Sequence, residues 1–105
     1  MEVELIKKFE LYIERGDRLV EESRYGEAYE AYLDALKTLG ALVVYRETGM
    51  LVPAEKLEGF LGKYPKLEEA LRKFSSLTGS EETARALREE LEGLKGMMSL
   101  PSSER

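Results

Sequence analysis

Carboxylates are the side chains that give this chain its widest chemical options. Glu27, Glu30 and Asp34 are spaced so that they fall on one face of a helix. Such a face could hold a hard cation of the Mg²⁺ type through oxygen ligands. Carboxylate sites in helical bundles combine Glu with His, however, and this chain contains no His. We therefore interpret the three carboxylates as a solvated acidic face and expect neither a metal site nor a cofactor.

Tyrosines form a second group with possible binding chemistry. Tyr25, Tyr29 and Tyr32 follow one another on adjacent helical turns, and Tyr12 is expected across from them on the preceding helix. Exposed rings at this spacing could stack on a base or a peptide. The same spacing belongs to the apolar stripe that should be buried, so we favour core packing with the hydroxyls reaching water.

Basic residues gather around Pro65, although the chain as a whole is acidic. The cluster consists of Lys63, Lys66, Arg72 and Lys73, interrupted by Glu68 and Glu69. Such a patch could contact phosphate or an acidic partner. Ion pairs along helix faces are the alternative interpretation, and they would leave no free patch.

The composition excludes several classes of catalytic and metal site. The chain has 105 residues, none of them His or Cys. Nucleophilic sites of the Ser-His-Asp and Cys-His types, thiolate metal sites and disulfide bonds are therefore excluded. The 16 basic and 21 acidic residues give a net charge of -5, which argues against non-specific binding to nucleic acid or to anionic membranes. We expect the protein not to be an enzyme.

The start of the sequence and its apolar runs predict a cytoplasmic protein. The first residues, Met1 to Glu4, carry acid where a signal peptide carries Lys or Arg. The longest apolar run, from Leu39 to Tyr45, is far shorter than the roughly 20 residues of a membrane helix. The high content of Glu, Lys and Arg, without Cys or Trp, is also typical of a thermophile.

Apolar residues at helical spacing predict two long helices at the start of the chain. The first, over 2–22, carries an apolar stripe that begins at Val3 and includes Gly16. Ser23 is expected to break the chain there and to cap the second helix, over 24–46. This second helix is the most apolar element, so we expect it to be the central one.

Shorter helices and one further long helix follow. Gly49 suits the C-terminal end of the second helix. A short helix over 54–61 should bury Phe60 together with its leucines. Pro65 fits the first position of the next helix, and Ser80 fits the N-cap of the last.

These elements predict an all-α fold class. No segment alternates with period two over more than a few residues, so no strand is expected. Short links make successive helices antiparallel. The prediction is an antiparallel helical bundle of about five helices, two long, two short and one long. It forms a single domain over 1–98, followed by a flexible C-terminal tail over 99–105.

Small residues on the first two helices predict a close contact between them. Gly16 and Ala28 lack bulk where two antiparallel helices would touch, and Tyr32 and Ala35 would pack the next layer. Together with Tyr25, these residues stand at the offsets of a tetratricopeptide repeat, so the stretch resembles a single tetratricopeptide hairpin. That resemblance implies an adaptor, although no second copy follows along the chain.

A longer stretch, over 25–74, resembles the HEPN-like helical domains that are common in archaea. The shared features are a Tyr- and Ala-rich helix passing into an apolar run, a Gly-containing loop, a proline and a short leucine-bearing helix. In this chain they are Ala28, Ala35-Leu36-Lys37, residues 39–44, Gly49, Pro53, Leu57 and Leu61. The resemblance implies an antiparallel helical bundle that is often dimeric.

The lack of His decides which activity this resemblance can imply. HEPN ribonucleases carry an Arg, several further residues and then a His, and the chain offers no His for that motif. RNA cleavage by that route is therefore excluded. Members without the motif are implied to act as binding partners, for example of small nucleotidyltransferases.

The last helix carries a narrow apolar seam that suits packing against one partner helix. The predicted partner surface consists of Leu87, Leu91, Leu94, Met97 and Met98. We expect this surface to form a homodimer, and the alternative is that the helix docks onto the core of its own chain.

Together these patterns predict a non-enzymatic helical protein–protein interaction or scaffold domain that self-associates. Two alternatives stay open. One is a tetratricopeptide-like adaptor, and the other is the binding partner of a small nucleotidyltransferase or of a nucleic-acid-associated two-component system. No feature of the sequence identifies the protein partner.

Overall fold

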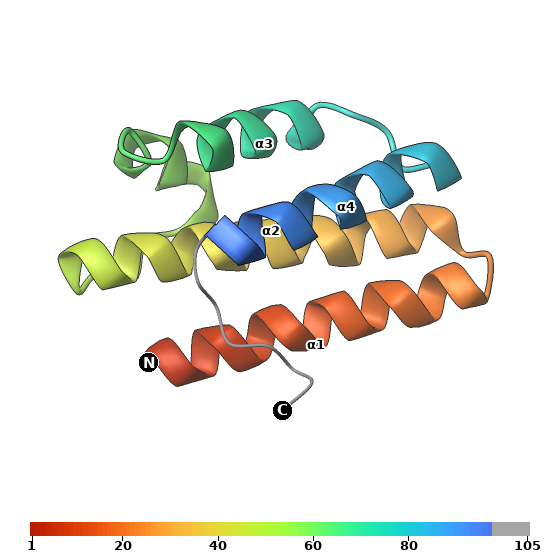
Figure 1. Cartoon of the computed structure of the whole chain (residues 1–105), viewed down its shortest axis with the longest axis horizontal. Helices are drawn as coiled ribbons and strands as arrows, with labels where there is room; N and C mark the ends of the chain where they lie inside the picture. The colour runs from red at the N-terminus through yellow and green to blue at the C-terminus, as the bar shows by residue number, and fades with distance from the viewer. Residues whose placement is uncertain (98–105) are drawn as a thin grey trace.

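The computed structural model describes residues 1–97, which form four α-helices and one 3-10 helix with no strand among them. The elements are α1 (Glu2–Glu21), α2 (Tyr25–Thr48), η1 (Ala54–Phe60), α3 (Pro65–Ser75) and α4 (Glu81–Met97). The prediction of an all-α bundle is confirmed (Figure 1). The expected contact of Met98 and the expected tail over 99–105 lie outside the described residues.

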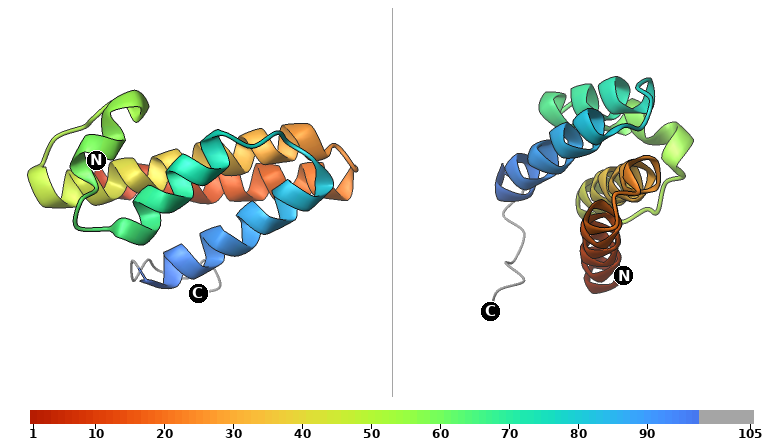
Figure 2. Two further views of the ribbon diagram at one scale, coloured as in Figure 1. Left: turned by 90° about the horizontal axis from the view of Figure 1, so that it is seen from above. Right: turned by 90° about the vertical axis from the view of Figure 1, so that its right-hand side faces the viewer.

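Helix α2 is the centre of the bundle, since it contacts each of the other helices. Helix α1 runs antiparallel to it on one side, and η1, α3 and α4 cover the other side (Figure 2). Leu36, Leu39 and Leu42 of α2 are completely shielded from water. The most apolar helix of the sequence is therefore the central one, as predicted. Within residues 1–97, no helix is both long enough and apolar enough to cross a bilayer.

The connection between α1 and α2 differs from the prediction that Ser23 caps the second helix. Ser23 adopts a left-handed conformation with φ of 60°. Its N–H donates to the Val20 carbonyl at 2.9 Å, and the N–H of Arg24 donates to the Leu19 carbonyl at 2.8 Å. This pair of backbone bonds is the Schellman arrangement that closes a helix C-terminus. Ser23 thus ends α1, and α2 begins without a side-chain cap.

Three other predicted helix ends are confirmed. Gly49 follows α2 in a left-handed conformation with φ of 74°, which glycine adopts without steric cost. Pro65 occupies the first turn of α3. At the start of α4, the Thr83 N–H donates to Ser80 Oγ at 3.2 Å, and the Ser80 N–H donates to Thr83 Oγ1 at 2.8 Å. Two backbone donors of the last helix are satisfied in this reciprocal way.

Two side chains that were expected to be buried are exposed. Val3 is 64% exposed, because it lies about 200° around the helix axis from Leu5, which faces the core. Phe60 is 44% exposed, whereas Leu57 and Leu61 are buried. The expected burial assumed α-helical winding, but η1 is a 3-10 helix with three residues per turn, so its side chains point in different directions.

Candidate functional site

Gly16 brings α1 and α2 into close contact, because its missing side chain leaves room for an aromatic ring. A Cβ atom placed on Gly16 would stand 2.3 Å from Tyr32 Cε1, well inside van der Waals contact. Tyr32, Ala28 and Ala35 are buried as well. The four residues predicted as helix contacts therefore all lie in the interior of the bundle.

Asp17 connects three helices through its carboxylate. The Tyr32 hydroxyl donates to Asp17 Oδ1 at 2.5 Å, and Arg88 of α4 donates from Nε to the same oxygen at 2.9 Å. A second bond runs from Arg88 Nη2 to Asp17 Oδ2 at 3.2 Å. Burial, followed by the Asp17 hydrogen bond, raises the pKa of the Tyr32 hydroxyl above its ordinary value of 10.0. The three side chains fix α4 against the α1–α2 hairpin.

Sequence reasoning missed Asp17 and Arg88. The two residues stand 71 positions apart, and each is surrounded by other charged residues of a highly charged chain. No spacing marks one as the partner of the other. The only sequence signal is that Asp17 directly follows Gly16, which lies on the buried stripe and so marks a helix contact.

The predicted tyrosine cluster is divided between core and surface. Tyr29 and Tyr32 are buried, and the Tyr29 hydroxyl donates to the main-chain carbonyl of Phe74. Core packing is therefore confirmed for these two rings, but their hydroxyls bond to protein rather than to water. Tyr25 and Tyr12 are partly exposed and lie under arginine guanidinium groups, at 5.9 Å from Arg85 and at 5.6 Å from Arg15 respectively.

The seam of the last helix packs on the core of its own chain. Leu87, Leu91 and Leu94 are each at most 2% exposed. This burial corrects the prediction that these three leucines form a partner surface. The alternative, in which the last helix docks onto the core of its own chain, is what the structure shows. An a/d pattern shows which side chains of a helix need an apolar neighbour, but not which chain supplies it. Of the predicted partner surface, Met97 is exposed in the described residues.

A groove lies between α3 and α4 on the outside of the bundle. It has a volume of about 410 Å³. Lys66 and Lys73 come from the α3 side, and Glu89 and Glu90 from the α4 side. The other lining residues include Phe74, Gly93, Leu94 and Met97. We call this the α3–α4 groove.

The basic patch predicted around Pro65 is divided by this arrangement. Lys63 lies 3.8 Å from Glu47, and Arg72 lies 3.5 Å from Glu58. Lys66 and Lys73 form no ion pair within residues 1–97, although the ammonium of Lys73 lies 5.1 Å from the centre of the Phe74 ring. Ion pairs thus occupy half of the patch, but only the pair of Arg72 with Glu68, at 3.8 Å, runs along one helix face as the alternative interpretation expected. The other two join different elements, and Lys66 and Lys73 line the α3–α4 groove.

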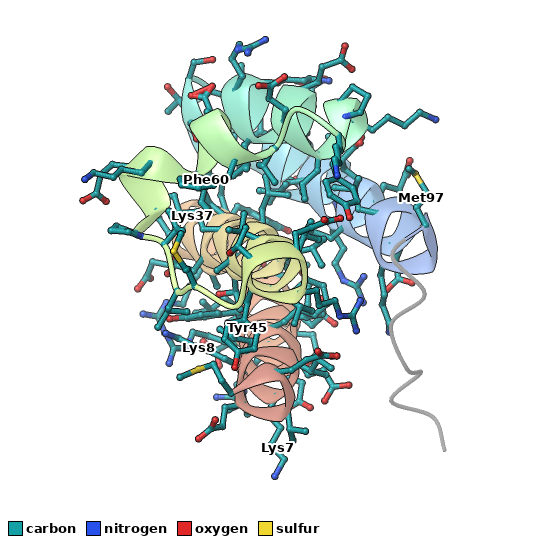
Figure 3. All side chains as sticks on the ribbon, turned by 90° about the vertical axis from the view of Figure 1, so that its left-hand side faces the viewer. Lys7, Lys8, Lys37, Tyr45, Phe60 and Met97 are labelled. Carbon is teal, nitrogen blue, oxygen red and sulfur yellow. The ribbon has the colours of Figure 1, made fainter. Side chains whose placement is uncertain are left out.

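A second and larger depression, of about 490 Å³, lies on another side of the molecule. Its walls come from α1, α2, the segment that links α2 to η1, and η1 itself. Its apolar lining includes the buried side chains of Leu5, Val52 and Leu57, and its charged lining includes Lys8 and Lys37. We call this the α1–α2 cleft. Figure 3 shows Lys8 and Lys37 on one side of the bundle and Met97, at the end of the α3–α4 groove, on the other.

The acidic face of α2 is spread over different neighbours. Glu27 accepts two hydrogen bonds from Arg24, at 2.6 and 2.7 Å, while Glu30 is exposed and Asp34 lines the α1–α2 cleft. In the part of the chain that the structure describes, no three acidic side chains lie close enough together to hold a metal ion.

Comparisons with known proteins add no relative. No protein-family model, no curated protein and no solved structure matches this chain. The resemblances to HEPN-like domains and to a tetratricopeptide hairpin therefore stay predictions. The described residues present several surface depressions that combine apolar lining with charged side chains, and the α3–α4 groove and the α1–α2 cleft are two of them.

Proposed function

We propose that this protein is a non-enzymatic helical scaffold that self-associates through the α3–α4 groove. The observation that carries the proposal is the charge arrangement of this groove. Lys66 and Lys73 lie on one side of it, and Glu89 and Glu90 lie on the other. None of these four side chains belongs to an ion pair within residues 1–97. Each side of the groove is therefore free to meet charges of the opposite sign.

A second copy of the same chain meets this requirement by symmetry. In a two-fold dimer the same patch serves on both subunits, so the lysine side of one copy faces the glutamate side of its partner twice. The exposed Met97 and the shallow surface over Gly93 give the partner an apolar contact between the charged sides. Exposed ion pairs contribute little affinity, so here the charges select the partner and its register, and the apolar contact stabilises the complex.

Sedimentation equilibrium of charge-reversed variants tests the proposal. The wild type is expected to associate beyond its monomer mass of 12.0 kDa. The Lys66→Glu/Lys73→Glu variant makes both sides acidic, and the Glu89→Lys/Glu90→Lys variant makes both sides basic. Each variant alone is expected to be monomeric, whereas an equimolar mixture of the two is expected to form a heterodimer.

A matched control separates this effect from a general change in charge. The Lys7→Glu/Lys56→Glu variant changes the net charge by the same amount, and neither lysine lines the α3–α4 groove. This control variant should associate as well as the wild type does, whereas the same charge change within the groove should abolish association. A wild type that stays monomeric at high concentration, or a mixture of variants that does not associate, contradicts the proposal.

A further inference from the structure

The α1–α2 cleft combines an apolar floor with an open apolar edge. Leu5, Val52 and Leu57 are buried where they line it. Leu51, which lines the same cleft, is 57% exposed. The floor depends on a close approach at Gly40 of α2, where an added Cβ would stand 3.1 Å from Leu57 Cδ1. The bundle thus leaves Leu51 uncovered at the edge of a cleft whose floor is apolar.

The charged side chains of the cleft favour an anionic partner. Lys8 of α1 and Lys37 of α2 line it, and neither forms an ion pair within the described part of the chain. Of the two carboxylates that line it, Glu4 already lies 3.0 Å from the amino group of Met1. Asp34 is the remaining acidic group. The cleft is therefore locally cationic on a chain whose net charge is -5.

The walls of the cleft restrict the conformation of a partner. Its long walls are α-helices, whose main-chain N–H and C=O groups bond within each helix. They offer no free strand edge to an extended peptide. A partner that satisfies its own backbone, such as an α-helix, avoids unpaired polar groups on binding. From Met1 to Tyr12 the α1 wall is about 16 Å long, which corresponds to roughly three helical turns.

We infer that the α1–α2 cleft is a docking site for one face of an amphipathic helix whose apolar side chains are flanked by carboxylates. The apolar side chains of that helix contact Leu51 at the open edge of the cleft, above the floor formed by Leu5 and Val52, and its carboxylates pair with Lys8 and Lys37. This site is separate from the α3–α4 groove, so it provides a scaffold that self-associates with a second binding surface.

Fluorescence anisotropy with synthetic peptides tests the inference. The first peptide is a labelled helix of about four turns with leucines at positions i, i+4 and i+7 and glutamates beside them. The second has lysines in place of the glutamates, and the third has serines in place of the leucines. The wild type is expected to bind the first peptide at least ten-fold more tightly than either of the others. The Lys8→Glu/Lys37→Glu variant is expected to prefer the second peptide.

Lys7→Glu serves as the control, because Lys7 is an exposed neighbour of Lys8 that does not line the cleft (Figure 3). It should leave the preference for the first peptide unchanged. Failure of the wild type to bind the first peptide, or equal binding of the first two, overturns the inference. Loss of self-association in Lys8→Glu/Lys37→Glu also overturns it, since the occupant would then be a second copy. Because Lys8 and Lys37 lie outside the α3–α4 groove, failure in the peptide-binding assays alone leaves the proposed self-association standing.

Discussion

Two helix pairs of this bundle each include a glycine, and the two pairs are built in opposite ways. On α1, Gly16 is covered by the ring of Tyr32, so that α1 and α2 are in close contact. On α4, no atom outside the backbone of that helix and the residues next to Gly93 lies within 4 Å of where a Cβ on Gly93 would stand, and Gly93 lies in the open α3–α4 groove. The comparison shows that a glycine marks a helix contact only where a side chain of the neighbouring helix occupies the space above it.

Charges differ between the same two regions. Beside Gly16, the carboxylate of Asp17 accepts bonds from Tyr32 and Arg88, and the polar groups satisfy one another within the chain. Beside Gly93, the lysines and glutamates of the groove have no ion-pair partner in residues 1–97. A region whose polar groups bond to one another stabilises the monomer, whereas a region whose charged side chains lack ion-pair partners is available to bind a second molecule.

The largest effect is expected from a substitution that disrupts the contact between Gly16 and Tyr32. Gly16→Ala should lower the free energy of unfolding by about 2 kcal/mol, because the new methyl group would overlap three atoms of the Tyr32 ring and overpacking of this severity costs about 3 kcal/mol, the upper end of the usual range. The higher helix propensity of Ala, worth about 1 kcal/mol, offsets only part of this cost. Urea denaturation followed by circular dichroism measures the change. The double variant Gly16→Ala/Tyr32→Leu should recover part of the loss, and purely additive effects would argue against the contact.

Removing one hydroxyl should have an intermediate effect. Tyr32→Phe deletes the hydrogen bond to the Asp17 carboxylate but leaves Arg88 paired with it, so we expect a loss of about 1 kcal/mol at neutral pH. The same denaturation experiment measures it. A variant as stable as the wild type would show that the bond contributes nothing net to the connection between the helices.

The hydroxyl of Tyr32 also predicts a dependence on pH. Burial and the Asp17 hydrogen bond raise its pKa in the folded protein above the ordinary 10.0. The folded state therefore keeps a proton that the unfolded state releases, so the stabilisation is complete below pH 10 and declines as the pH rises above it. Between pH 8 and pH 11 the wild type should lose more stability than Tyr32→Phe. Burial raises the pKa of Tyr29 as well, so Tyr29 contributes to the same loss of stability at high pH. The Tyr29→Phe variant measures that contribution separately from the contribution of Tyr32.

The smallest effect is expected from a substitution at Gly93 in the α3–α4 groove. Gly93→Ala should raise the free energy of unfolding by up to about 1 kcal/mol, because Ala is the better helix former and nothing in the chain opposes its methyl group. The measurement belongs at dilutions where the protein is monomeric. A loss of stability in this variant would mean that the space above Gly93 is filled after all, and the contrast with Gly16 would disappear.

Local patterns predicted most of the fold, because helix ends are decided by a few neighbouring residues. Pro65, Ser80 and Gly49 take the positions that their backbone and capping chemistry favour. Ser23 did not follow its side-chain preference, since closing α1 requires a left-handed residue at that point and the backbone bonds of the turn outweigh one cap.

The candidate surfaces could not be predicted in the same way. The spacing of Leu87, Leu91 and Leu94 showed that these residues need apolar contact, but the contact comes from their own chain. The pairing of Asp17 with Arg88 depends on how α4 lies across the hairpin. The same is true of the groove and the cleft, whose residues come from separate helices that no sequence pattern places side by side.

The segment that leads through η1 has a consequence for motion within the bundle. Of residues 50–61, only Val52, Leu57 and Leu61 are buried, and the segment has a 3-10 rather than an α-helical hydrogen-bond pattern. Such thinly anchored segments open at a much smaller free energy than the core of a domain. Its amide protons should therefore exchange with deuterium long before those of α2. Each such opening removes Val52 and Leu57 from the floor of the α1–α2 cleft, so the lifetime of the closed segment sets an upper limit on the residence time of the helix that we infer to dock there.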